Sequence, residues 1–173
     1  AIDDTISGSY FTFDTGSARF IILESSSWSE GGTQESWLQT LLEKTTGEER
    51  VRKVFLIGHH PIWPVSRAFF SNLAFSDALG RLLERFPVDA YFCGHTHNQS
   101  VILRRTRNHP VLQCMGAPIG LPEDLPTPLD RVHARLVDED DIAWSWSGYL
   151  ENTAPGWFLV RVEHDHVEVC WHH

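Results

Sequence analysis

Positive charge is scarce in this sequence. Its 173 residues include 14 Lys and Arg against 23 Asp and Glu, which gives a formal net charge of −9. A surface that binds nucleic acid needs Lys and Arg clustered on one face, so this balance argues against a nucleic-acid-binding surface. The same balance gives no long-range attraction for phosphate-bearing substrates, so any anion site must depend on positive charge close to it.

Long apolar runs and paired cysteines are also missing. No uninterrupted apolar run approaches the roughly 18 residues that a membrane-spanning helix needs, so we expect no membrane span. The three cysteines, Cys93, Cys114 and Cys170, show no paired spacing. Each lies in an apolar, strand-like context, where a buried structural thiol is more common than a metal ligand or a nucleophile. Neither feature indicates a cellular compartment.

What is present is the composition of one globular domain, because hydrophobic residues make up 42% of the chain. In the first half, strand-like and helix-like apolar patterns alternate. They predict a hairpin over 9–24, a helix that begins at Gly32 or Thr33, a buried strand over 52–58, a helix over 73–86 and a second buried strand over 88–94. This order is typical of an α/β layer.

The second half, residues 99–173, has a different character. It holds short strand-like runs and no convincing helix, and its Pro-rich segment 116–130 is long enough to indicate a functional or mobile loop. The expected strands are 100–104, 110–115, 131–137, 143–149, 157–163 and 167–172. With the first half, they predict an α/β protein of two packed sheets, with helices covering one of them.

Four of the ten histidines lie in two similar motifs, each at the end of a predicted buried strand. The motifs are FLIGHHPIWP at 55–64, with His59 and His60, and AYFCGHTHNQ at 90–99, with His95 and His97. Loops that leave parallel strands converge on one crevice, which is where α/β proteins place their sites. One crossover helix between the two strands would make them adjacent and parallel, and would bring the motifs side by side.

This arrangement predicts a metal site. In an extended GHTH segment the imidazoles of His95 and His97 would project to the same side, and neutral imidazole is a common ligand of Zn, Fe and Mn. We expect Gly58 and Gly94 to let the backbone leave the sheet sharply and approach a ligand closely. One His-x-His pair alone is a weak signal, and the prediction rests on the two motifs together. We also expect the loop 116–130 to border this crevice.

Several segments together carry a family resemblance. The chain resembles the C-terminal half of a calcineurin-like metallophosphoesterase, and is especially similar to purple acid phosphatases and related bacterial phosphoesterases. The matching segments are TQESWLQTLL, VFLIGHHPIW, VDAYFCGHTHN, VLQCMGAP and GWFLVRVEHDHVEVCW. The resemblance implies a two-sheet sandwich of the four-layer αββα type, with residues 1–173 forming the C-terminal part of one domain.

The resemblance also implies an activity and a set of ligands. Members of that family hydrolyse phosphate mono- or diesters with two divalent or trivalent metal ions, such as Mn, Fe or Zn. By motif matching, His59 and His95 would bind one ion and His97 the other. His60 would contact a phosphoryl oxygen or orient a ligand, unless it has a supporting or packing role. Trp63 would either wall the pocket or lie in the core.

Part of the family pattern is absent. The N-terminal half of the family supplies further motifs that begin with Gly-Asp or Gly-Asn, and neither dipeptide occurs here. Three imidazoles are too few for two ions, which need three or more protein ligands each. We therefore expect this chain to supply half of an active site, with the remaining ligands on an upstream half or a second chain. Asn98 would contact substrate or cap its loop.

Two readings compete with a hydrolase. One is a catalytically silent homologue that binds a metal ion or a partner. The other is an unrelated metal-binding or structural domain whose turns coincide with the motifs. Metal content and the upstream sequence would distinguish them.

Overall fold

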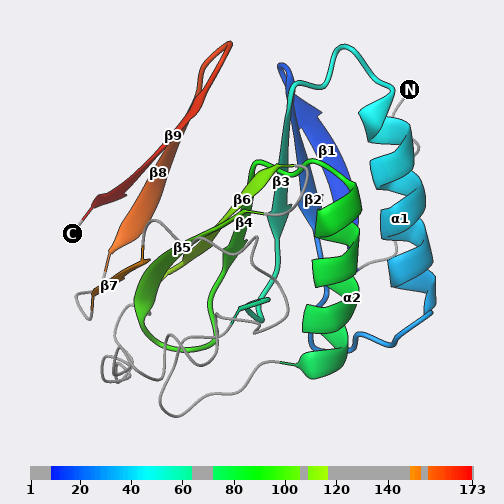
Figure 1. Cartoon of the computed structure of the whole chain (residues 1–173), viewed down its shortest axis with the longest axis horizontal. Helices are drawn as coiled ribbons and strands as arrows, with labels where there is room; N and C mark the ends of the chain where they lie inside the picture. The colour runs from blue at the N-terminus through cyan, green and yellow to red at the C-terminus, as the bar shows by residue number, and fades with distance from the viewer. Residues whose placement is uncertain (1–8, 64–71, 106–108, 117–148, 153–155, 173) are drawn as a thin grey trace.

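The computed structural model describes residues 9–63, 72–105, 109–116, 149–152 and 156–172 (Figure 1). Its elements are β1 (Phe11–Thr15), β2 (Ala18–Ile22), α1 (Thr33–Thr46), β3 (Lys53–Ile57), α2 (Leu73–Arg85), β4 (Ala90–Cys93), β5 (Gln99–Arg105), β6 (Pro110–Met115), β7 (Tyr149–Asn152), β8 (Trp157–Val162) and β9 (Val167–His172). The helices and strands expected within these ranges are present, with small differences at their ends. The expected strand 131–137, most of 143–149, and the loop from residue 117 onward lie outside the described residues.

A seven-stranded mixed sheet forms the centre of the fold, in the order β1-β2-β3-β4-β6-β5-β7. Strands β2, β3, β4 and β6 run parallel to one another, while β1, β5 and β7 are antiparallel to their neighbours. The hairpin of β8 and β9 forms a separate two-stranded antiparallel sheet. The α/β prediction with two sheets is therefore confirmed.

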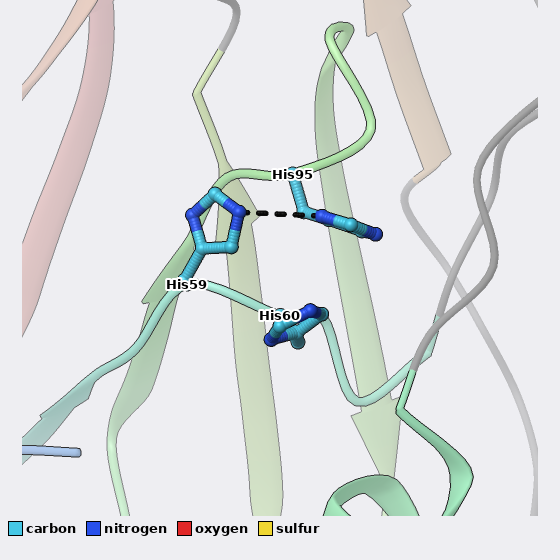
Figure 2. A group of neighbouring side chains, drawn as sticks. All are labelled: His59, His60 and His95. Carbon is cyan, nitrogen blue, oxygen red and sulfur yellow. Dashed lines mark hydrogen bonds between the residues drawn. The ribbon is translucent and has the colours of Figure 1, made fainter. Parts of the chain in front are cut away.

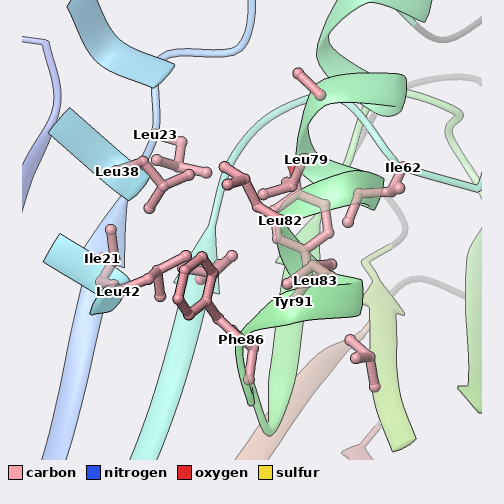
Figure 3. Packing of buried hydrophobic residues seen from close by; sticks show 14 of the residues in the cluster. Ile21, Leu23, Leu38, Leu42, Ile62, Leu79, Leu82, Leu83, Phe86 and Tyr91 are labelled. Atoms are coloured by element: carbon pink, nitrogen blue, oxygen red, sulfur yellow. The ribbon is translucent and has the colours of Figure 1, made fainter. Parts of the chain in front are cut away.

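The two helices cover one face of the large sheet (Figure 1). Side chains alternate across a strand, so Val54 and Leu56 of β3 join the core under the helices while Phe55 points to the opposite face. From α1 and α2, Leu38, Leu42, Leu79, Leu82 and Leu83 complete this main cluster (Figure 3). Burial on both faces explains why β3 reads as a continuous apolar run.

The hairpin of β8 and β9 packs against the other face of the large sheet. Phe55 and Ala90 form a second, smaller cluster there, and Val160 and Val167 of the hairpin pack against it. The order of layers is thus helices, large sheet and small sheet, as the sequence predicted.

A row of aromatic rings crosses that same face of the large sheet. Successive centroids are 6.3 Å apart for Phe11 and Phe13, 5.2 Å for Phe13 and Phe20, 5.1 Å for Phe20 and Phe55, and 6.2 Å for Phe55 and Phe92. The row begins in the core and ends on the edge strand β1, where Phe11 and Phe13 are 39% and 41% exposed.

A buried charge network joins the first hairpin to the end of α1. Arg19 is 5% exposed, and its guanidinium bonds Asp14 at 2.8 Å, Glu48 at 3.0 Å and the hydroxyl of Thr45 at 2.7 Å. Arg50 pairs with the same two carboxylates, at 2.7 and 2.9 Å. Asp14 and Glu48 therefore each accept from two guanidinium groups.

Two further features outside the site concern the helices and the cysteines. Neither described helix has the length and apolar character needed to cross a bilayer. All three cysteines are free, and burial raises the pKa of Cys114 to about 12 and that of Cys93 well above its usual value. Both thiols are therefore protonated at neutral pH, which agrees with a structural role.

Candidate metal centre

The site lies where three adjacent parallel strands end. Strand pairing continues past the strand ends through the backbone: Leu23 N–H donates to Ile57 O at 2.8 Å, and Gly58 N–H donates to Phe92 O at 3.0 Å. Gly94 N–H then donates to His59 O at 3.0 Å. These bonds hold the turns that follow β2, β3 and β4 against one another.

Three imidazoles converge in these turns (Figure 2). One ligand atom from each of His59, His60 and His95 lies within 4.8 Å of those of the other two. His59 Nε2 and His95 Nδ1 face each other at 3.2 Å, and the rings of His60 and His95 are 4.4 Å apart between centroids. The predicted convergence of His59 and His95 is therefore confirmed.

Ser25, in the turn after β2, holds the His59–His60 segment. Its Oγ accepts from the backbone N–H of His59 at 3.2 Å and of His60 at 3.0 Å, and lies 2.9 Å from His60 Nδ1. The side chain of Asn72, which caps α2, donates to the carbonyl of Ser25 at 3.1 Å. The start of α2 therefore positions Ser25, and Ser25 positions the two histidines.

Tyr91 of β4 supports the same segment from below. Its side chain is buried, and its hydroxyl donates to the carbonyl of His60. A Cβ at position 58 would lie 2.6 Å from that hydroxyl, so Tyr91 favours glycine there. The expected close approach of Gly58 to a ligand stays a prediction. At Gly94 a Cβ would meet no heavy atom within 4 Å, so the space beside that turn is open.

The GHTH segment is not extended, and the expectation that it would be was wrong. His95 and His97 both have left-handed backbone conformations, with φ of 77° and 56°. Between them Thr96 is fully buried, and its hydroxyl donates to Asn98 Oδ1 at 2.7 Å. The backbone wraps around this inward-pointing residue.

His97 is not one of the three convergent imidazoles. It lies near enough to His59 for the charges of the two rings to repel, and its own side chain is half-buried. Its role as a ligand of a second ion stays a prediction.

Partial burial favours the neutral form of His59 and of His60. It lowers the pKa of His59 and of His60 below the usual value for imidazole, and repulsion from His95 lowers both further. Neutral imidazole is the form that binds a metal ion. Two nitrogens bonded to one tetrahedral ion at about 2.0–2.1 Å would lie about 3.3 Å apart, close to the separation of His59 Nε2 and His95 Nδ1. The donor set therefore fits a metal ion.

Trp63 and Asn98, the two further candidates, are both buried. Trp63 is 8% exposed and belongs to the main hydrophobic cluster, and Asn98 is fully buried and accepts the bond from Thr96. Their positions agree with the core and loop-capping alternatives. The backbone at Trp63 is held by buried Gln113 of β6, whose side chain accepts from Trp63 N–H at 3.0 Å and donates to Trp63 O at 2.9 Å.

Sequence reasoning missed the residues that hold the site together. Ser25 follows a predicted strand, but nothing in the run SSSW distinguishes it from Ser26 or Ser27. Tyr91 and Gln113 read as strand residues. Polar groups inside an otherwise apolar strand were the one available signal, because a buried polar side chain must find a partner.

Comparisons with known proteins identify the family and the fold. The family model described as calcineurin-like phosphoesterase matches residues 2–99. A purple acid phosphatase from yellow lupin (Lupinus luteus) seeds has a similar structure, with a TM-score of 0.64 and 15% identity over 87% of this chain and 28% of that one. GAP50, the anchor in the inner membrane complex of Plasmodium, has a TM-score of 0.62 and 14% identity over 94% and 48%.

Those two similarities show a shared fold, since identity is low in both. The chain spans less than half the length of either protein. A search of curated protein sequences found no match.

Proposed function

Because this chain belongs to the calcineurin-like phosphoesterase family, we propose that it supplies part of a dinuclear metal centre that hydrolyses phosphate mono- or diesters. The observation that carries the proposal is the approach of His59 Nε2 and His95 Nδ1 to 3.2 Å at the ends of two adjacent parallel strands. Imidazoles held this close by the backbone would form a preorganised pair of ligands.

Each histidine has a proposed role. His59 and His95 would hold one ion, Mn, Fe or Zn, and His97 would contribute to the second. When bound, such ions supply the positive charge that neutralises phosphoryl oxygens and lower the pKa of a bound water. That local charge offsets the net charge of −9, which would otherwise repel an anionic substrate.

The remaining ligands come from outside these residues. The sequence contains neither Gly-Asp nor Gly-Asn, and among the described residues the convergent metal-ligating group holds three imidazoles and no carboxylate. We expect an upstream half or a second chain to provide the other donors, carboxylates among them. Both structural neighbours are longer than this chain, as we would expect if it normally acts together with such a part.

Activity measurements test the proposal. The 173-residue chain and the longest natural protein that contains it are compared on p-nitrophenyl phosphate and its bis-ester, with Mn or Zn added. We expect the short chain to be nearly inactive and the longer protein to turn over substrate. His95→Ala should remove the turnover. His164→Ala should not, because His164 is exposed, lies in the turn between β8 and β9, and is not one of the convergent imidazoles.

Two outcomes would contradict it. Full metal-dependent turnover by the short chain would show that the missing donors lie within it. An inactive longer protein that still binds metal would favour a silent homologue with a binding role. That second candidate is supported by the similarity to GAP50, which is named as an anchor.

A further inference from the structure

The three neighbours of the Ser25 hydroxyl determine which hydrogen bonds it accepts and which one it donates. A serine hydroxyl donates one hydrogen and accepts two. The backbone N–H groups of His59 and His60 can only donate, and they occupy both acceptor positions of Ser25 Oγ, at 3.2 and 3.0 Å. The one hydrogen of the hydroxyl is therefore available for its third neighbour, His60 Nδ1, at 2.9 Å.

This count determines which nitrogen of His60 carries the proton. If Ser25 donates to Nδ1, that nitrogen is an acceptor and carries no hydrogen. A neutral imidazole then has its hydrogen on Nε2. The opposite tautomer would make Ser25 Oγ accept three hydrogens.

This tautomer gives His60 a different role from that of His59 and His95. His59 Nε2 and His95 Nδ1 point at each other, whereas the Nδ1 of His60 is turned toward the protein. The ring of His60 is half-buried and lies 5.0 Å from that of His59 and 4.4 Å from that of His95 between centroids (Figure 2). A protonated Nε2 cannot bind a metal ion, but it donates well to an anionic oxygen.

We propose that Ser25 holds His60 in the Nε2–H tautomer, and that His60 binds a phosphoryl oxygen of the substrate instead of a metal ion. This inference rests on the proposed function for the identity of the anion. Ser25 is then a positioning residue, which acts through His60. The carbonyl of His60, held by the hydroxyl of Tyr91, fixes the backbone from which the ring projects.

The tautomer can be read directly in the metal-free full-length protein. Long-range ¹H–¹⁵N correlation spectra of histidine-labelled protein distinguish Nδ1–H from Nε2–H rings, and His60→Gln identifies the His60 signal by its loss. We expect an Nε2–H ring in the natural protein and a mixture of tautomers in Ser25→Ala. Ser27→Ala, at an exposed serine of the same turn, should leave the signal unchanged.

Two substitutions separate the possible roles of His60. Glutamine places an amide N–H close to the position of Nε2, whereas asparagine places it close to Nδ1. We expect His60→Asn to weaken inhibition by inorganic phosphate about 10- to 100-fold, because a hydrogen bond to a charged group is lost. His60→Gln should weaken it by no more than about threefold. Bound metal should stay the same in both variants and fall in His95→Ala.

The outcomes are distinct. An Nδ1–H ring at His60 would overturn the proposal, and so would loss of bound metal in His60→Gln, because either result marks His60 as a ligand. If the protein proves inactive toward phosphate esters, the proposed function fails. The spectra and the metal content still decide the tautomer and the ligand question separately.

Discussion

At the scale of single residues, the histidines are positioned by side chains that bind backbone. Tyr91 reaches the carbonyl of His60, and Ser25 accepts from the amides of His59 and His60. Such contacts within the protein would reduce the reorganisation that binding at the proposed site requires.

The close approach of Gly58 to the Tyr91 hydroxyl gives a first prediction. Gly58→Ala would place a Cβ 2.6 Å from the Tyr91 hydroxyl, so we expect the free energy of unfolding to fall by about 1–3 kcal/mol. Tyr91→Phe removes the clashing oxygen, and the double variant should recover part of that loss. Urea unfolding of both single variants and the double variant measures the coupling. Strictly additive effects would contradict the assigned contact.

The sequence could predict which histidines meet, but not how their rings are turned. His59 and His95 each follow a buried strand, and parallel pairing through one helix leaves few ways to separate them. The GHTH turn has left-handed residues on both sides of the buried Thr96, and no periodicity reveals this conformation. Tertiary contacts of that kind decide the finer geometry of the site.

At the scale of elements, the periodicity of apolar residues was enough to predict the strands and helices. The centre of the run at 52–58, residues 54–56, is buried on both faces because helices cover one side and the small sheet lies on the other. The polar connections between elements were not predictable. Arg19 lies in a strand but carries the junction of β1, β2 and α1.

That junction gives a prediction about acid stability. Hydrogen bonds from Arg19 lower the pKa of Asp14 and of Glu48 below their usual values. A lowered folded-state pKa contributes stability above the unfolded-state pKa, and that contribution is lost as pH falls through the folded-state value. We therefore expect the free energy of unfolding to decline from about pH 4.5 downward.

Substitution at Arg19 checks the cause. Arg19→Met should lower the free energy of unfolding by about 2–3 kcal/mol near neutral pH. This loss is at or below the low end for a broken buried ion pair, because Arg50 still pairs with both carboxylates. The substitution should also flatten the acid decline. Arg81→Met, at an exposed pair with Glu30, should cost no more than about 0.5 kcal/mol. Equal acid sensitivity in the natural protein and Arg19→Met would contradict the assignment.

Two buried glutamines provide a matched pair. Gln113 bonds the backbone of Ile62 and Trp63, so Gln113→Leu leaves buried amides unpaired and should cost about 2–5 kcal/mol. Gln99 is also fully buried, yet neither atom of its amide has a hydrogen-bond partner in the described structure. Gln99→Leu should therefore be neutral or stabilising. Thermal unfolding measures the stability of the two variants, and a larger loss of stability in Gln99→Leu than in Gln113→Leu would contradict the prediction.

At the scale of the whole molecule, the aromatic row marks a face that continues beyond the small sheet. Phe92 lies 6.4 Å from Phe158 of β8 between centroids, whereas Phe11 and Phe13 at the other end are exposed. The four-layer fold that the family resemblance implies would cover this face with a second full sheet. The exposed rings lie on the edge strand β1, where unpaired backbone favours association.

We therefore expect the isolated 173-residue chain to self-associate. Replacing Phe11 and Phe13 together by Lys should reduce the association, since charge on an edge strand opposes pairing. Light scattering after size-exclusion chromatography measures the mass. Lys substitution of Thr12 and Asp14 would disturb other contacts, so exposed Thr40 of α1 is the better control position. A monomeric natural chain would contradict the prediction.

The order of strands also determines when the histidine turn is completed as the chain is made. β5 follows β4 in sequence, but β6 lies between them in the sheet. The turn 94–98 therefore lacks its neighbours until β6 has emerged: Gly116 N–H donates to Cys93 O at 3.0 Å, and Thr96 contacts the sulfur of Met115. A nascent chain that ends before residue 110 already carries His59 and His95, and Gly94 can bond His59, but the contacts that β6 makes with the second motif are still missing. If the site binds an ion as proposed, we expect the growing polypeptide to bind it firmly only after β6 has been synthesised.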